Sequence, residues 1–417
     1  MPTSQSAAPG LFPTFFISGF ECSTFRWKDR RRRDLAAETR HREHYLEDYQ
    51  TLHDLGIGVA REGIPWPLVD GRTYDFSLID GAIEALNQYQ ILPIWDLCHY
   101  GYPEDTDPFD HDFVERFASY CRAAAEYVVP RVRGPHFFTP INEITFFAFC
   151  GGDWGWVAPY LHGRENRHRL RLRLCEAAIA GTHALRQVDP EARMVSVDPL
   201  VQVVAPVDRP DLQPAAWQET DVDTFYAWDV LAGRRHPELG GSSEVLDIVG
   251  LNCYSFGQME YRGDGPHAAL PPDDRRIVSL CDLMRHAWER YRRPMIVAET
   301  SGLRDGRAAW LKDVMEESLA AVAQGMDLHG VCLFPAVDMP DWHTGEWLHN
   351  GICDLVERDG DLVRVPAENY VAELRRWQAL LNRVTVLDED PFSDPVNLGD
   401  VVEAALRYRF QPDTNWS

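Results

Sequence analysis

Short apolar runs alternate with amphipathic helical patterns along most of this chain, and the alternation repeats eight times. Apolar runs of this length indicate buried strands, and apolar residues spaced three or four positions apart indicate helices. Strands are expected over residues 15–20, 57–62, 91–98, 136–143, 192–198, 246–252, 295–299 and 328–334. Helices are expected over 41–55, 77–89, 113–128, 170–188, 221–231, 276–291, 307–324 and 367–381. Eight strand–helix units favour an α/β fold, a closed (β/α)8 TIM barrel of parallel strands.

The length of the chain fits one such barrel. Its 417 residues are many for one domain but ordinary for a barrel with extended loops, and 45% hydrophobic residues supply a large core. We expect a polar N-terminal segment over 1–14 and a single barrel over 15–383. The remainder, 384–417, is expected to pack on the barrel or trail from it, with one short helix over 401–408.

Charge and cysteine placement argue against several classes of partner. The formal net charge of −24 repels nucleic acid and anionic membranes. No glycine-rich phosphate loop follows a strand, and nine scattered cysteines fit neither a disulfide framework nor a zinc site. The sequence also shows no secretory signal pattern and no apolar run of the roughly 20 residues that span a bilayer. We expect a cytoplasmic protein without metal or cofactor, and its oligomeric state stays open.

Two of the expected strands end on a glutamate. The run over 136–143 ends in Asn142-Glu143, and the run that begins at Pro294 ends in Glu299. Because the carboxyl ends of parallel barrel strands meet at one mouth, both carboxylates are expected to face one pocket. Paired carboxylates flanking a bond are the catalytic groups of glycoside hydrolysis. The competing structural explanation is that Glu143 only caps the next helix.

Motifs at six strand ends occur in the order found in one enzyme family. They are Arg61–Trp66, Asp96–Tyr100, Thr139–Ile144, Asp247–Tyr254, Ala298–Gly302 and Gly330–Trp342. Through them the chain resembles the family 1 glycoside hydrolases, and more loosely the wider clan of retaining β-glycosidase barrels, over about residues 15–360. The resemblance implies that Glu299 is the nucleophile and Glu143 the acid/base of a retaining β-glycosidase of β-glucosidase type.

Three positions depart from the family pattern. Phe334 replaces a sugar-stacking Trp, Asp341 replaces a Glu that binds outer sugar hydroxyls, and Ile144 replaces a Pro. The first two departures put the sugar in doubt rather than the chemistry. A mannose-, xylose- or fucose-type sugar is therefore an alternative to glucose.

Charged and aromatic residues near the strand ends supply the rest of the expected site. Arg61 is expected to hold Glu299 ionised, and Tyr254 to donate a hydrogen bond to the same carboxylate. A cluster of phenylalanines would desolvate Glu143: Phe146, Phe147 and Phe149. The competing explanations are that Arg61 pairs with Glu62 and that Tyr254 only packs in the core.

Sugar contacts follow from the resemblance and from aromatic content. Asn142 is expected at the sugar 2-hydroxyl, His99 at the 2- or 3-hydroxyl, and Glu21 at another hydroxyl, although His99 also fits a core histidine. Asp341 is expected in the sugar subsite. Aromatic walls are expected from four tryptophans: Trp154, Trp156, Trp342 and Trp347.

Three further hypotheses remain open. Arg30–Arg33, the basic cluster of an acidic chain, either contacts an anionic substrate or is a solvated loop paired with Asp29, Asp34 and Glu38. A metal-dependent hydrolase would use His99, His111 and Asp198. A non-catalytic sugar-binding barrel would need neither glutamate for chemistry. The partner in the main prediction is a carbohydrate or glycoside.

Overall fold

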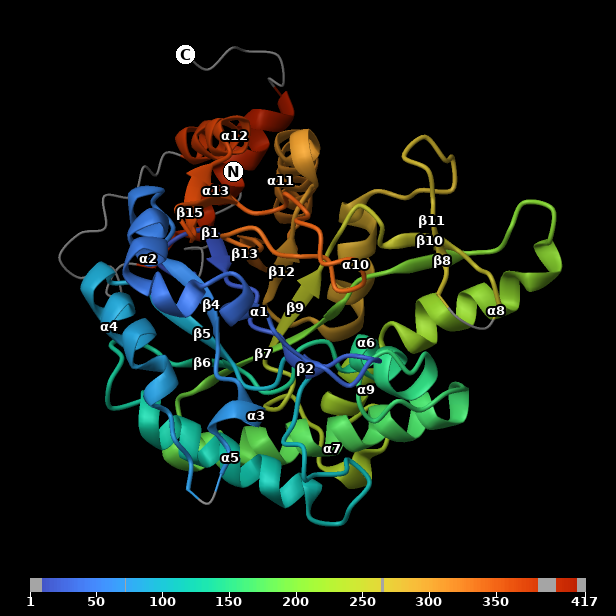
Figure 1. Cartoon of the computed structure of the whole chain (residues 1–417). Helices are drawn as coiled ribbons and strands as arrows, with labels where there is room; N and C mark the ends of the chain where they lie inside the picture. Colours follow the sequence, from blue (N-terminus) through green and yellow to red (C-terminus); the bar gives the residue numbers. More distant parts are fainter. Residues whose placement is uncertain (1–9, 72, 264–265, 382–394, 411–417) are drawn as a thin grey trace.

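The chain forms a closed barrel of eight parallel strands (Figure 1), in a computed structural model that describes residues 10–71, 73–263, 266–381 and 395–410. The strands are β1 (Phe16–Gly19), β4 (Val59–Gly63), β5 (Leu92–Asp96), β6 (Phe137–Thr139), β7 (Arg193–Pro199), β9 (Ile248–Asn252), β12 (Met295–Thr300) and β13 (Leu328–Leu333). They pair in chain order around the ring, and β1 closes it against β13. The predicted (β/α)8 barrel is confirmed.

The interior of the barrel is filled by apolar side chains from every strand. This inner cluster includes Ile17, Val59, Ile94, Phe137, Val197, Ile248, Ile296 and Cys332. Because side chains alternate along a strand, the residues between these positions face the surrounding helices. The same alternation directs Arg61, two positions after Val59, into the barrel at its carboxyl end.

Helices cover the outside of the barrel (Figure 1). The main ones are α2 (Tyr45–Asp54), α4 (Asp80–Tyr89), α5 (Phe113–Val128), α7 (Arg164–Val188), α9 (Tyr226–Leu231), α10 (Leu280–Tyr291), α11 (Arg307–Ala323) and α12 (Glu368–Leu380). The shorter ones are α1 (Leu35–Glu38), α3 (Trp66–Val69), α6 (Ile144–Ala148) and α8 (Gln213–Trp217), with 3₁₀ turns η1 (His41–Glu43), η2 (Ser77–Ile79), η4 (Pro210–Leu212), η6 (Pro237–Leu239) and η7 (Arg304–Gly306). No helix of the described ranges is long and apolar enough to cross a bilayer.

Several predicted helices differ from the structure. The helix predicted over 276–291 begins at Leu280, and the one predicted over 41–55 is the turn η1 followed by α2. The helix predicted over 170–188 begins at Arg164. The prediction missed its first turns because they are charged and carry no apolar periodicity. The helix predicted over 221–231 is two elements, a π-helix η5 (Gln218–Asp223) followed by α9 (Tyr226–Leu231). A π-helical turn has no 3.6-residue repeat that a sequence pattern reveals.

Three small sheets in the connections were not predicted. They are the hairpin β2 (Thr24–Arg26) and β3 (Arg32–Asp34), the sheet of β8 (Gln202–Val204), β10 (Gln258–Glu260) and β11 (Ala268–Ala269), and the hairpin β14 (Cys353–Arg358) and β15 (Asp361–Pro366). Figure 1 shows the β8–β10–β11 sheet and α8 projecting from the side of the barrel. These strands follow barrel strands in the chain, so they add to the loops at the carboxyl end of the barrel.

The C-terminal part packs on the barrel helices where the structure describes it. Helix α13 (Leu398–Phe410) contains the predicted 401–408 helix. Its Tyr408 donates a hydrogen bond to Glu316 of α11, and the Tyr408 ring lies 5.2 Å from that of Trp377 on α12. The predicted N-terminal segment up to residue 9, and residues 382–394 and 411–417 of the extension, lie outside the described residues.

Candidate active site

Glu143 and Glu299 line one cavity of about 400 Å³ at the carboxyl end of the barrel. Glu143 follows β6 by four residues and directly precedes α6, but its side chain does not cap that helix. Asn252 connects the two glutamates: it pairs with Glu299 across β9 and β12, and its Nδ2 donates to Glu143 Oε1 at 2.7 Å. The two carboxylates are 6% and 5% exposed, so both lie largely out of solvent.

A β-bulge directs Glu299 into the cavity. Ile296 and Ala298 of β12 face the barrel interior, so strict alternation would turn Glu299 towards the helices together with Val297. The pairing of β12 with β9 shifts register between Val297 and Glu299, and such an extra residue re-aims the side chain that follows it. The position of the Glu299 carboxylate in the cavity therefore depends on a local irregularity in the strand.

Arg61 and Tyr254 both bind the Glu299 carboxylate. Arg61 Nη1 donates to Oε1 at 2.5 Å, and the Tyr254 hydroxyl donates to Oε2 at 2.8 Å. A fixed positive charge and a hydrogen bond both stabilise the ionised carboxylate. The alternative pairing of Arg61 with Glu62 is wrong, because Glu62 faces the other side of β4 and binds His41 and Tyr49 at 2.9 and 2.7 Å.

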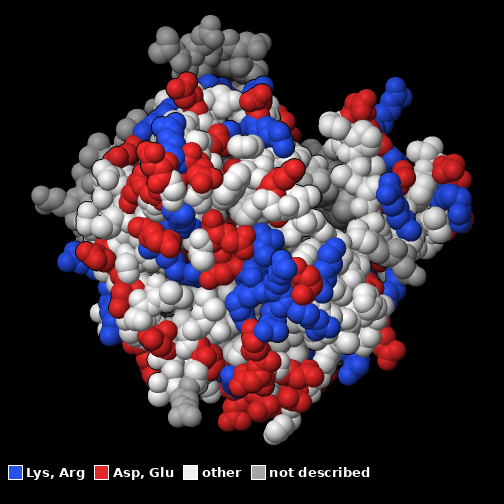
Figure 2. All heavy atoms as spheres, viewed as in Figure 1, with Lys and Arg blue, Asp and Glu red and all other residues white. Residues whose placement is uncertain are grey.

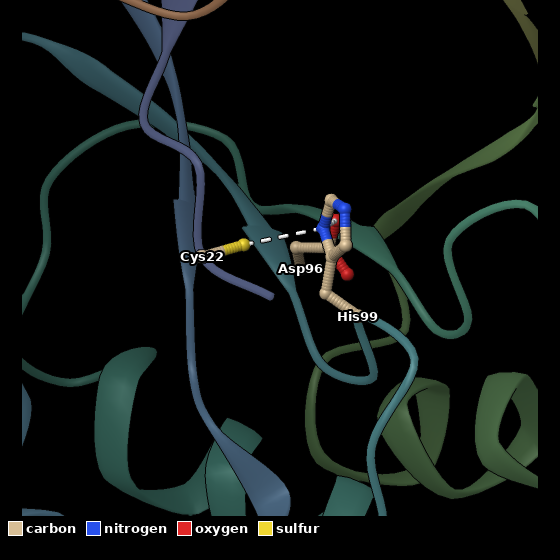
Figure 3. A group of neighbouring side chains, drawn as sticks. All are labelled: Cys22, Asp96 and His99. Atoms are coloured by element: carbon tan, nitrogen blue, oxygen red, sulfur yellow. Dashed lines mark hydrogen bonds and ion pairs between the residues drawn. The ribbon is translucent and has the colours of Figure 1, made fainter. Parts of the chain in front are cut away.

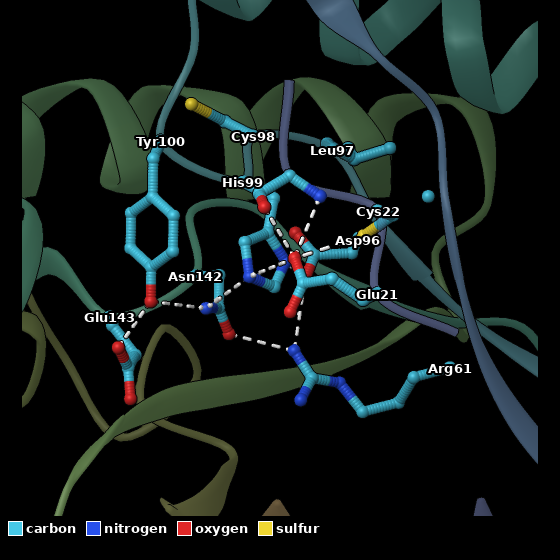
Figure 4. A network of polar contacts seen from close by, with 12 residues as sticks. Glu21, Cys22, Arg61, Asp96, Leu97, Cys98, His99, Tyr100, Asn142 and Glu143 are labelled. Atoms are coloured by element: carbon cyan, nitrogen blue, oxygen red, sulfur yellow. Dashed lines mark hydrogen bonds and ion pairs between the residues drawn. The ribbon is translucent and has the colours of Figure 1, made fainter. Parts of the chain in front are cut away.

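The other terminal guanidinium nitrogen of Arg61 donates hydrogen bonds to two further buried residues. Its Nη2 donates to Asp96 Oδ2 at 2.8 Å and to Asn142 Oδ1 at 2.7 Å (Figure 4). Asn142 Nδ2 lies 3.1 Å from His99 Nε2. Asn142 is fully buried and does not line the cavity, so its contact with a sugar hydroxyl stays a prediction.

Cys22, Asp96 and His99 lie close enough together to share a metal ion (Figure 3). The Cys22 sulfur is 3.3 Å from His99 Nδ1, which is itself 3.0 Å from Asp96 Oδ2. Burial raises the pKa of the Cys22 thiol to about 12, and metals bind the thiolate rather than the thiol. Since Asp96 Oδ2 also accepts from Arg61, the group fits a hydrogen-bond network better than a metal site.

The other arrangements of metal-ligating residues are weaker. Asp338, His349 and Asp354 also cluster, but Arg307 already pairs with Asp354 at 2.9 Å. The predicted alternative of His99, His111 and Asp198 does not assemble among the described residues, because the His111 side chain is 98% exposed. That hypothesis is wrong in its choice of ligands.

Glu143 accepts its hydrogen bonds from neutral groups, whereas Glu299 pairs with the Arg61 cation. Burial and the nearby charge of Glu299 raise the pKa of Glu143 to about 7, and hydrogen bonds from Tyr100 and Asn252 limit that rise. The Tyr100 hydroxyl donates to Glu143 Oε2. Tyr100 was not predicted as a site residue, although it is the last residue of the Asp96–Tyr100 motif. The family that this motif resembles carries a tryptophan at this position, so the match suggested an aromatic ring and not a hydroxyl donor.

Several predicted contact residues do line the cavity: Glu21, His99, Tyr254, Asp341 and Trp342. The aromatic wall is formed by Trp154 and Trp156 with Phe146 and Phe149, whereas Trp347 does not line the cavity. Phe334 packs inside the barrel with the guanidinium of Arg61 5.3 Å from its ring centre, so it offers no stacking face to the cavity. The sugar-contact roles of these residues stay predictions.

Charged residues from η5 also line the cavity and were not predicted. Glu219 and Asp223 line it, with Arg167 of α7 behind them at 3.6 and 3.5 Å. Arg171 pairs with Asp223 at 2.8 Å. No single stretch of sequence carries this cluster, because its members come from two connections brought together only by the fold.

The basic cluster Arg30–Arg33 occupies the β2–β3 hairpin, where Figure 2 shows basic residues gathered beside acidic ones. Arg31 lies 3.8 Å from Asp29, Arg32 pairs with Glu104 at 2.8 Å, and Arg33 pairs with Glu38 at 2.7 Å. Arg30 stacks on the Tyr160 ring. Of the predicted partners, Asp34 pairs with Arg42 instead. The pairing favours the solvated, ion-paired loop.

Comparison with known proteins finds similar sequences at low identity. No protein-family model matches the chain. β-Glucosidase 25 of rice (Oryza sativa subsp. japonica) is 22% identical over 419 residues, covering 80% of this chain and 82% of that protein. Human lactase/phlorizin hydrolase is 22% identical over 424 residues, covering 82% of this chain and 22% of that protein. Both names are those of glycoside hydrolases, as the sequence motifs predicted.

Solved structures show the same fold. The AHE enzyme from Alicyclobacillus herbarius superimposes with a TM-score of 0.73 at 16% identity, covering 90% of this chain and all of that one. The family 1 β-glucosidase from Thermotoga maritima gives a TM-score of 0.67 at 18% identity, covering 82% and 87% of the two chains. The resemblance to family 1 glycoside hydrolases is confirmed, with this chain a divergent relative.

Proposed function

We propose that this chain, a distant relative of the family 1 β-glucosidases, is a retaining β-glycosidase of β-glucosidase type. The observation that carries the proposal is the pair of buried carboxylates in one cavity, each held by different neighbours. Arg61 and Tyr254 stabilise the ionised form of Glu299, while burial and the charge of Glu299 raise the pKa of Glu143 to about 7. An ionised nucleophile beside a protonated acid is the starting state of retaining hydrolysis.

In the first step Glu299 attacks the anomeric carbon of the bound glycoside. The bond to the aglycone oxygen breaks, and Glu143 gives its proton to that oxygen as it departs. The product is an ester between Glu299 and the sugar, in which the configuration at the anomeric carbon is inverted once. As the negative charge of Glu299 is lost to the new bond, the hydrogen bonds that Arg61 and Tyr254 donate to its oxygens weaken.

In the second step Glu143 acts as a base. The charge of Glu299 is among the causes that raise the pKa of Glu143, and it disappears when Glu299 becomes an ester. The pKa of Glu143 therefore falls in the intermediate, and the ionised carboxylate takes a proton from water. Attack by that water inverts the anomeric carbon again, so the product keeps the β configuration.

The cavity suggests how a glycoside is held. Glu21, His99 and Asp341 offer polar contacts for hydroxyl groups, and Trp342 offers an apolar face for the sugar ring. Phe334 lies inside the barrel and Asp341 has a shorter side chain than glutamate, so a mannose, xylose or fucose glycoside remains the alternative substrate. The Thermotoga maritima β-glucosidase binds glucoimidazole, which favours glucose as the first sugar to test.

Azide rescue tests both glutamates with one reagent. The wild-type protein is expected to hydrolyse one of a panel of aryl β-glycosides and to keep that activity in EDTA. In Glu299→Ala, azide takes the place of the missing nucleophile and gives the α-glycosyl azide. In Glu143→Ala, azide attacks the intermediate and gives the β-glycosyl azide. Each variant is the control for the other, and the same azide from both would contradict the assignment. Sugar binding without hydrolysis of any glycoside would instead indicate a non-catalytic barrel.

A further inference from the structure

Tyr100 makes a contact with Glu143 that the proposed mechanism has not used. Its hydroxyl donates to Glu143 Oε2 and lies 3.2 Å from Asn142 Nδ2 (Figure 4). Because the amide of Asn142 donates to the phenol oxygen, the phenol's own proton is directed at Glu143. Burial and the charges of Glu143 and Glu299 raise the pKa of Tyr100 far above its usual value, so the hydroxyl remains a donor.

The loop that carries Tyr100 is held firmly in place. Tyr100 has a φ of 64°, a left-handed conformation that is uncommon for a residue with a side chain. The next residue is Gly101, where a Cβ would lie 1.7 Å from the carbonyl oxygen of Thr24. Phe146 and Trp342 meet the Tyr100 ring nearly at right angles, at 5.7 and 5.3 Å. The hydroxyl therefore has a fixed direction from a tightly packed wall.

The contact identifies which oxygen of Glu143 carries the transferable proton. Oε1 accepts from Asn252 Nδ2 at 2.7 Å, so a proton on that oxygen would meet an N–H group. An amide N–H has a fixed direction, whereas a phenol hydroxyl can rotate its hydrogen away, so we infer that the proton is on Oε2, the oxygen that Tyr100 contacts. When Oε2 is ionised it accepts the Tyr100 hydrogen bond, and when Oε2 is protonated that donation is lost. Tyr100 thus favours the ionised form of Glu143.

We propose that Tyr100 is a positioning residue for Glu143: it fixes Oε2 at the cavity wall and biases Glu143 towards the ionised form that activates water. It acts against burial and Glu299, which favour the protonated form that the first step needs. The balance lets one carboxyl group serve as acid and then as base. This inference rests on the proposed glycosidase function and adds the residue that sets the protonation balance of its acid/base.

The pH profile tests the proposal. Tyr100→Phe removes only the hydroxyl, and a hydrogen bond to a charged group corresponds to a pKa change of roughly one to two pH units. The basic limb of kcat/KM and the acidic limb of kcat for an activated aryl glycoside are both expected to move up by about one pH unit. Tyr100→Trp is a second variant without a hydroxyl. Tyr102→Phe, whose ring packs near Phe113 and Phe147, is the matched control and keeps the wild-type limbs.

Two results would overturn this role, and neither is confused with failure of the glycosidase proposal. Lower rates at every pH with unmoved limbs would show that Tyr100 only supports the fold. The second readout needs no activity: the Glu143 carboxyl carbon is titrated by ¹³C NMR, with its resonance assigned from Glu143→Gln. An unchanged titration in both Tyr100 variants would contradict the proposal even if no glycoside were hydrolysed.

Discussion

Neighbouring residues on strand β4 point to opposite sides and bind different partners. Arg61 faces the barrel interior and binds Glu299, whereas Glu62 faces the helices and binds His41. The single-residue alternation of a strand therefore separates the site from the scaffold. At Glu299 the same alternation is broken by a bulge, and only then does the carboxylate reach the cavity. Function at this scale depends on which way each side chain points.

Glu143 is predicted to cost stability at neutral and higher pH. Its pKa is about 7 in the folded protein against an ordinary 4.5, so stability is lost as pH rises from 4.5 to 7, because the unfolded state ionises first, and the loss reaches about 3 kcal/mol above pH 7. Below pH 4.5 both states are protonated and the cost vanishes. Glu143→Gln, which is neutral throughout, is expected to unfold several degrees above wild type at about pH 8 and together with it at about pH 4.

Thermal unfolding followed by circular dichroism measures this difference. Glu244→Gln is the control, because Glu244 is exposed and its substitution should leave both unfolding temperatures unchanged. A Glu143→Gln variant that is less stable than wild type at about pH 8 would show that the buried charge is well compensated.

At the level of elements, the sequence predicted the barrel better than its connections. Both ends of α5 match the prediction, because its apolar stripe (Phe113, Phe117, Tyr120, Cys121, Ala124 and Val128) begins after the polar Asp112 and ends two residues before the helix-breaking Pro130. The connections carry no such period. The π-helix η5 and the small sheets form through contacts between distant segments, which is why Glu219 and Asp223 were missed. Tyr100 was missed for another reason: its motif match suggested only an aromatic ring.

The loop after β6 is predicted to select the aglycone. Trp156 lines the cavity and its ring lies 4.6 Å from that of Trp154. Trp156→Ala is expected to raise KM for aryl β-glycosides roughly tenfold. An aryl aglycone packed on the Trp156 ring would contribute about 1 kcal/mol beyond the apolar area that it covers, and the substitution removes that contact. Methyl β-glycosides, which do not reach this wall, should change little.

Initial rates on aryl and methyl glycosides give the comparison. Trp217→Ala is the control, because Trp217 is 54% exposed on α8 and does not line the cavity. An equal loss on both glycosides would place Trp156 in the support of the fold rather than in aglycone binding.

At the scale of the whole molecule, charge is predicted to restrict the substrate. The chain carries a formal net charge of −24, and the Arg30–Arg33 cluster is mostly neutralised by acidic neighbours. A neutral β-glucoside is therefore expected to exceed its 6-phosphate at least tenfold in kcat/KM at low salt, with the gap narrowing as salt screens the field. A preference for the phosphate that disappears in Arg30→Ala would show that the cluster binds an anionic substrate.

Trapping the covalent intermediate tests the central claim most directly. An activated 2-deoxy-2-fluoro-β-glucoside, or the corresponding derivative of the preferred sugar, forms the glycosyl-enzyme ester and then hydrolyses slowly, because fluorine destabilises the positive charge of both transition states. Peptide mass spectrometry is expected to find one sugar on Glu299, absent in Glu299→Ala. A sugar on any other residue, or no adduct from a protein that cleaves the parent glycoside, would contradict the mechanism proposed for Glu143 and Glu299.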